Sequence, residues 1–60
     1  MTLFKFKFVF PGANSKTTGY IEAENRTAAK FALEDRYTRG YAAEILERDH
    51  VPEGETVINL

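Results

Sequence analysis

The chain has 60 residues, with 8 basic against 9 acidic side chains and no cysteine, and a chain of this length has room for one domain with one core. The missing cysteine excludes disulfides, thiolate chemistry and cysteine-ligated metal sites, and it fits the reducing cytoplasm. The formal net charge of −1, with both signs spread along the chain, disfavours nucleic-acid binding through bulk electrostatics.

A first strand is predicted over residues 2–10, where phenylalanine recurs at every second position. The rings are those of Phe4, Phe6, Phe8 and Phe10, and the residues between them are Lys5, Lys7 and Val9. Because side chains alternate between the two faces of a strand, the rings share one face and both lysines share the other. Four large rings need a wide apolar cover, which we expect the alanine-rich segment downstream to provide as a helix.

A hairpin follows the first strand. Pro11 and Gly12 end that strand, and residues 11–16 predict a turn. A second strand is predicted over residues 17–23, antiparallel to the first. Its alternation places Gly19, Ile21 and Ala23 on one face and Thr18, Tyr20 and Glu22 on the other.

A helix is predicted over residues 26–39, which contain no glycine or proline. Asn25 is a good N-cap, and Gly40 follows in the C′ position that commonly ends a helix. One broad arc of this helix carries Ala28, Ala29, Ala32, Leu33, Arg36 and Tyr37. The alanines let the helix approach the sheet while the phenylalanine rings fill the space. The stem of Arg36 would lie on the core with its guanidinium beyond the sheet edge.

Two further strands are predicted, over residues 41–49 and 56–60, with a turn at residues 50–55 between them. In the simplest register of the third strand, Ala43 and Ile45 point inward, while Ala42, Glu44, Leu46 and Arg48 point outward. A slip of one residue, which buries Leu46 instead of Ile45, stays open as an alternative. In the last strand Ile58 and Leu60 point inward.

These elements predict an α+β fold of order ββαββ, with one helix on one face of a four-stranded, mainly antiparallel sheet. Two strand orders are open. The order 2-1-3-4 needs only local connections, and the alternative is a β-grasp order with strand four parallel to strand one. The phenylalanine strand is central in both.

The sequence lacks the residue pattern of a catalytic or metal site, so we expect no enzyme, no cofactor and no metal. His50 is the only histidine and lies beside Asp49, but neighbouring strand residues point to opposite faces, and no nucleophile accompanies them. Residues 12–17 lack the glycine that a phosphate-binding loop has before its lysine. Asn25 also begins a glycosylation sequon, but its place favours helix capping.

The sheet face away from the helix is the strongest functional lead. It would carry Lys5, Lys7, Tyr20 and Arg48, and an open sheet face with an aromatic residue among cations suits a protein partner. Phe31 falls on the helix side away from the alanine arc, and an exposed phenylalanine suggests a further contact. We therefore predict that Lys5, Lys7, Tyr20, Phe31 and Arg48 contact a partner.

We expect that partner to be a protein or a ribonucleoprotein. Nucleic-acid binding on the open sheet face is the alternative, although RNA-binding sheets stack bases on two or three exposed aromatics and only Tyr20 is expected here. Edge pairing is a further route, in which strand two or strand four accepts a partner strand and gives a homodimer or a peptide complex. No apolar run approaches the roughly 18 residues of a membrane span, so no membrane partner is expected.

The segment from Gly19 to Ala29, together with Leu33 and Ile45, resembles a strand–cap–helix–strand module. The module is similar to the start of the cytoplasmic domains of type II secretion platform proteins, although Lys30 departs from the apolar residue favoured there. It also resembles very short phage anti-CRISPR proteins that pack one helix on an antiparallel sheet. The second resemblance implies a small inhibitor that blocks the surface of a larger assembly, such as a CRISPR effector complex.

Overall fold

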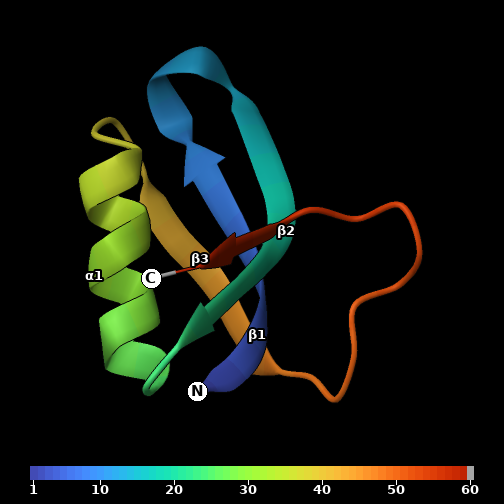
Figure 1. Cartoon of the computed structure of the whole chain (residues 1–60). Helices are drawn as coiled ribbons and strands as arrows, with labels where there is room; N and C mark the ends of the chain where they lie inside the picture. Colours follow the sequence, from blue (N-terminus) through green and yellow to red (C-terminus); the bar gives the residue numbers. More distant parts are fainter. Residues whose placement is uncertain (60) are drawn as a thin grey trace.

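A computed structural model describes residues 1–59 of the chain and shows one helix against a four-stranded sheet (Figure 1). The elements in chain order are β1 (Thr2–Phe10), a 3-10 turn (Pro11–Ala13), β2 (Ser15–Ala23), α1 (Arg26–Arg36), β3 (Tyr41–Glu47) and β4 (Val57–Asn59). The predicted α+β class and the ββαββ order are confirmed.

The phenylalanine ladder of β1 forms the core as predicted. Phe4, Phe6 and Phe8 are buried on the face that α1 covers, and Ala29 and Leu33 of α1 are fully buried against them. Phe10 is half-buried at the end of the ladder, with its ring centroid 5.3 Å from that of Phe8. Small residues on α1 and large rings on β1 therefore share one close-packed layer.

The helix begins where the sequence predicts and ends earlier. The side chain of Asn25 accepts a hydrogen bond from the backbone N–H of Ala28 at 2.8 Å, which makes it the N-cap. The helix stops at Arg36, because Tyr37 adopts an extended conformation that places its ring against Phe8 and Phe10. The predicted helical residues 37–39 are therefore a loop. Arg36 is exposed, with its guanidinium 6.0 Å from the Tyr37 ring centroid.

The sheet order is β3-β1-β2-β4, which differs from both orders expected from the sequence. β1 pairs antiparallel with β2 and β3, but β4 pairs with β2 in parallel. β3 and β4 are thus opposite edges, and residues 48–56 must cross the sheet between them. Nine extended residues reach up to about 30 Å. The width of a four-stranded sheet is roughly 14 Å, so this segment can span the sheet without forming a helix.

A register shift between Lys7 and Phe8 changes which face the first residues of β3 point to. Glu44 lies opposite Lys7, but Ala42 lies opposite Phe8, so Ala43 is an extra residue, as in a β-bulge. Ile45 points inward and Leu46 outward, as the simplest register predicts. The predicted faces of Ala42 and Ala43 are wrong, because the bulge turns Ala42 onto the core and leaves Ala43 exposed.

The short last strand adds to the core from the far edge. β4 has three residues, and Ile58 packs against the core from its position opposite Ile21 of β2, as predicted for its face. The prediction that Leu60 points inward falls outside the described residues. Among the described residues β4 pairs with β2 only at Tyr20, Ile21 and Glu22, so residues 15–19 of β2 stay at the sheet edge, and pairing of strand two with a second copy stays a prediction.

Candidate binding surface on the outer sheet face

The sheet face opposite α1, called the outer face below, is built by the cross-strand registers. Residues directly opposite in paired strands point to the same face, so the registers of the described residues give four rows on it. Three rows join β3, β1 and β2: Tyr41, Val9 and Lys16; then Glu44, Lys7 and Thr18; then Leu46, Lys5 and Tyr20, which Val57 of β4 extends. The fourth row is Leu3, Glu22 and Asn59.

Apolar and cationic side chains are exposed together on this face. Tyr41 is 50% exposed and Leu46 is 39% exposed, both on the edge strand β3. Lys5 is exposed next to Leu46, whereas Lys7 is half-buried between its neighbours. Tyr41 faces outward because the bulge reverses the alternation of β3 between Glu44 and Ala42. The result is an open patch that mixes an aromatic ring, an aliphatic side chain and ammonium groups.

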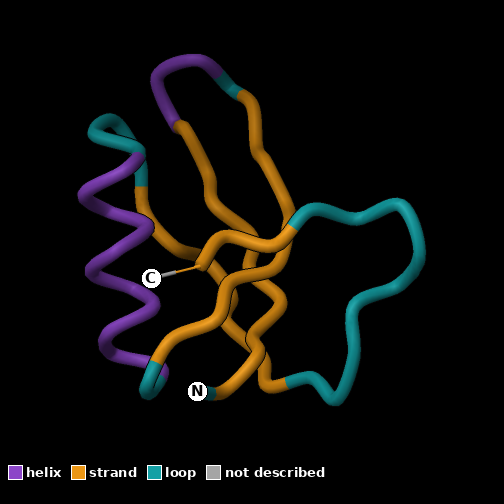
Figure 2. The backbone as a smooth tube through the Cα atoms, viewed as in Figure 1, coloured by secondary structure: helices purple, strands orange, loops and turns teal. Residues whose placement is uncertain are grey.

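Tyr20 lies on this face, as predicted, but it is only 6% exposed. The segment of residues 48–56 leaves the lower end of β3, runs on the side of the sheet away from α1, and enters β4 next to β2 (Figures 1 and 2). Tyr20 lies between Lys5 and Val57, close to where that segment joins β4. The expectation of an exposed Tyr20 is therefore wrong, and Tyr20 is part of the packed interior.

The five predicted contact residues do not form one surface. Phe31 is 62% exposed, but at 100° per residue it points directly away from the buried pair Ala29 and Leu33, so it lies on the helix side of the molecule. Arg48 is exposed just beyond β3, where its backbone N–H donates to the carbonyl of Leu3 at 2.9 Å. Lys5 and Lys7 are thus brought together on the outer face, while Phe31 is separated from them by the sheet and helix.

The adjacent residues Asp49 and His50 lie between β3 and β4. Asp49 and His50 are both exposed within the crossing segment. Among residues 1–59 no group of three or more histidine, aspartate or glutamate side chains is placed to hold a metal ion. The one α-helix of the described part, α1, has neither the length nor the apolar character that a membrane crossing requires.

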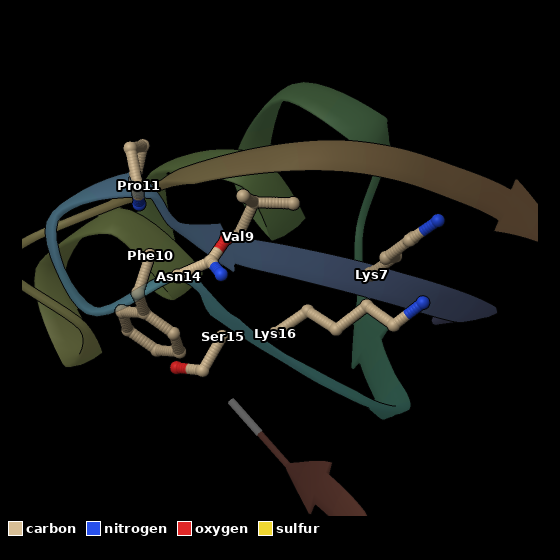
Figure 3. Close-up of a pocket in the computed structure, with 7 residues that line it drawn as sticks. All are labelled: Lys7, Val9, Phe10, Pro11, Asn14, Ser15 and Lys16. Atoms are coloured by element: carbon tan, nitrogen blue, oxygen red, sulfur yellow. The ribbon is translucent and has the colours of Figure 1, made fainter.

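Two features of the outer face were missed by the sequence analysis. Tyr41 becomes an exposed residue of the outer face through the bulge. The sequence does not indicate the bulge, because either Ala42 or Ala43 is small enough to face the core. Lys16, predicted to lie in the turn, belongs to β2 and sits opposite Val9. Beside it the end of the hairpin forms a hollow lined by Lys7, Val9, Phe10, Pro11, Asn14, Ser15 and Lys16 (Figure 3). A lysine within a turn-like sequence gives no signal of such a hollow.

Comparison of the chain with known protein families, with curated proteins and with solved structures found no match.

Proposed function

We propose that this chain is a non-enzymatic protein-binding module that contacts its partner through the outer face. The binding face consists of Lys5, Lys7, Lys16, Tyr41 and Leu46. The observation that carries the proposal is the exposure of Tyr41 and Leu46 on strand β3, beside lysines, on the side of the sheet that α1 leaves uncovered. Tyrosine is enriched where interfaces concentrate their binding energy, and cations at the rim direct the approach of a partner.

The charge of the binding face favours an acidic partner surface. Lys5, Lys7 and Lys16 lie on two neighbouring strands, and the acidic side chains beside them are Glu44, opposite Lys7, and Glu22, diagonal to Lys5. Such a patch attracts an acidic surface even though the whole chain has a net charge of −1. The sequence resemblance adds a narrower hypothesis, in which the partner is a large assembly such as a CRISPR effector complex and binding blocks it.

Nucleic-acid binding on the same face has less support. The burial of Tyr20 removes the aromatic residue on which the sequence analysis placed base stacking. Tyr41 is exposed on this face, but RNA-binding sheets use two or three such rings. We therefore retain protein binding as the function and treat nucleic acid as an outcome of the experiments below.

A pair of surface variants tests the proposal. The outer-face variant carries Lys5→Glu, Tyr41→Ser and Leu46→Ser, and the helix-face variant carries Lys30→Glu and Phe31→Ser. All five residues are exposed, so both variants should keep the circular dichroism spectrum of the wild type. Each tagged chain is used to capture partners from the cells that encode it, and the captured protein is then titrated in purified form.

We expect the outer-face variant to bind the purified partner at least tenfold more weakly, because it loses the aromatic and aliphatic contacts and reverses one charge. The helix-face variant should bind within about twofold of the wild type. The proposal is wrong if the helix-face variant loses the partner and the outer-face variant keeps it, since Phe31 would then mark the contact surface. Capture of nucleic acid alone, lost at high salt, would favour the alternative function.

A further inference from the structure

At the hairpin end of the binding face, a hollow with apolar lining lies next to two lysines, Lys7 and Lys16. The hollow introduced above has a volume of about 320 Å³. Pockets for small molecules span roughly 300–1,000 Å³, so this one is at the lower end and suits one or two side chains. We propose that it anchors an acidic peptide segment of the partner, with an apolar side chain inside the hollow and a neighbouring carboxylate on Lys7 and Lys16. This inference rests on the proposed protein-binding function and names the partner chemistry at the same face.

The turn between β1 and β2 creates the apolar part of the hollow. Pro11 begins a single 3-10 turn, which Asn14 ends in the left-handed conformation with φ of 52° while its N–H donates to the carbonyl of Pro11 at 3.3 Å. Val9 and the exposed Pro11 line the hollow together with Phe10, which is half-buried and whose ring also packs against Phe8 and Tyr37 on the α1 side of β1. An apolar side chain placed here would cover surface that is now exposed to water.

The two lysines supply the charged part. Val9 pairs with Lys16 and Lys7 pairs with Thr18, so Lys7 and Lys16 are diagonal neighbours on the outer face. Diagonal neighbours on paired strands are about 7–8 Å apart at the backbone, so two lysine side chains can reach the same ligand. Figure 3 shows both lysines extending in the same direction, away from Phe10 and Pro11. Glu44 lies opposite Lys7 on β3, whereas the residues that line the hollow come from β1, the turn and β2.

This arrangement favours a peptide over other anions. A simple inorganic anion would use the lysines and leave the apolar lining of Val9, Phe10 and Pro11 without a contact. A nucleic-acid backbone needs a track of several cations, but the outer face has Glu44 beside Lys7 and the chain carries a net charge of −1. A segment with one apolar residue between two carboxylates uses both parts of the hollow.

Fluorescence polarisation with a labelled seven-residue peptide tests the inference. The probe has a central leucine flanked by two aspartates, with serine and glycine elsewhere. One matched peptide replaces both aspartates by asparagine, and a second replaces leucine by serine. The proteins are the wild type, the Lys7→Gln/Lys16→Gln double variant and a Lys30→Gln control, which removes an exposed charge from α1. A single-stranded oligonucleotide of equal charge serves as competitor.

We expect the wild type and the Lys30→Gln control to bind the probe equally, and the double variant to bind about tenfold more weakly. Binding should fall with added salt, and each matched peptide should bind more weakly than the probe. Equal binding of the asparagine peptide, equal weakening by Lys30→Gln, or no binding at millimolar peptide would overturn the inference. Stronger binding of the oligonucleotide would overturn it in favour of nucleic acid. If the peptide fails while the outer-face variant still loses its captured partner, the hollow is excluded and the proposed function stands.

Discussion

Gly40 lies where the loop after α1 passes close to Val9 and Phe8 of the first strand. A Cβ atom built on Gly40 would be 2.2 Å from the carbonyl oxygen of Val9 and 2.7 Å from the ring of Phe8. Among the described residues the only glycine with a positive φ is Gly54, so Gly40 is required for close approach rather than for a left-handed conformation. The prediction that Gly40 is the C′ residue of the helix is wrong in position and in role, because the helix ends at Arg36 with Tyr37 as its C-cap.

We therefore predict that Gly40→Ala lowers the free energy of unfolding by about 1–3 kcal/mol or more, the usual cost of overpacking. The carbonyl oxygen of Val9 belongs to the backbone and cannot move aside as a flexible side chain can. Urea denaturation followed by circular dichroism measures the effect. Gly12→Ala is the matched control: nothing lies within 4 Å of its added Cβ atom, so it should change stability by less than about 1 kcal/mol. Equal stability of wild type and Gly40→Ala would show that the loop has another path.

Tyr20 and Tyr41 show at the residue scale what alternation can and cannot predict. Alternation within β2 placed Tyr20 on the correct face, because the period of a strand is a local property. Tyr20 is buried at the position where β2 pairs with Val57 of β4, and no local pattern encodes a neighbour so distant in the sequence. Tyr41 is the reverse case, since one inserted residue turned it outward.

At the scale of elements, the predictions that succeeded depend on strong local signals. The alternating rings of β1 and the capping residue Asn25 fixed one strand and the start of α1. The end of α1 was predicted three residues too late, because the apolar arc continues through Tyr37 whether or not that residue stays helical. The parallel pairing of β4 with β2 was missed, since a three-residue strand carries too few side chains to specify its neighbour.

The N-cap provides a prediction for α1 as an element. Replacing Asn25 by alanine removes the side-chain acceptor for the N–H of Ala28, and we expect the free energy of unfolding to fall by about 0.5–2 kcal/mol. Asn25→Ser is the matched control, because serine keeps an acceptor at the N-cap and should retain most of the stability. Thermal melts of both variants give the comparison. A loss with serine as large as that with alanine would mean that the cap is not the source of the effect.

At the scale of the whole molecule, the chain crosses its sheet once on each face. α1 carries the chain from β2 to β3 over the phenylalanine face, and residues 48–56 carry it back over the outer face to β4 (Figure 2). The first crossing buries the core, and the second lies on the face where Tyr20 is buried. The binding face therefore runs along β1 and β3 from the hairpin end to the row of Lys5 and Leu46, and Val57 of β4 lies at the opposite end of that row.

β1 and β4 should differ in the free energy needed to open them, because they pair with different numbers of strands. β1 is hydrogen-bonded to strands on both sides, so the amides of Phe4, Phe6 and Phe8 should exchange only through global unfolding, which for a chain of this size is expected to cost about 3–9 kcal/mol. β4 has three residues and pairs with one neighbour, so it should open locally at a lower cost. Amide hydrogen exchange by NMR should show protection factors in β4 at least about tenfold below those of β1. Equal protection in the two strands would mean that β4 and the covering of Tyr20 are lost only when the entire sheet unfolds.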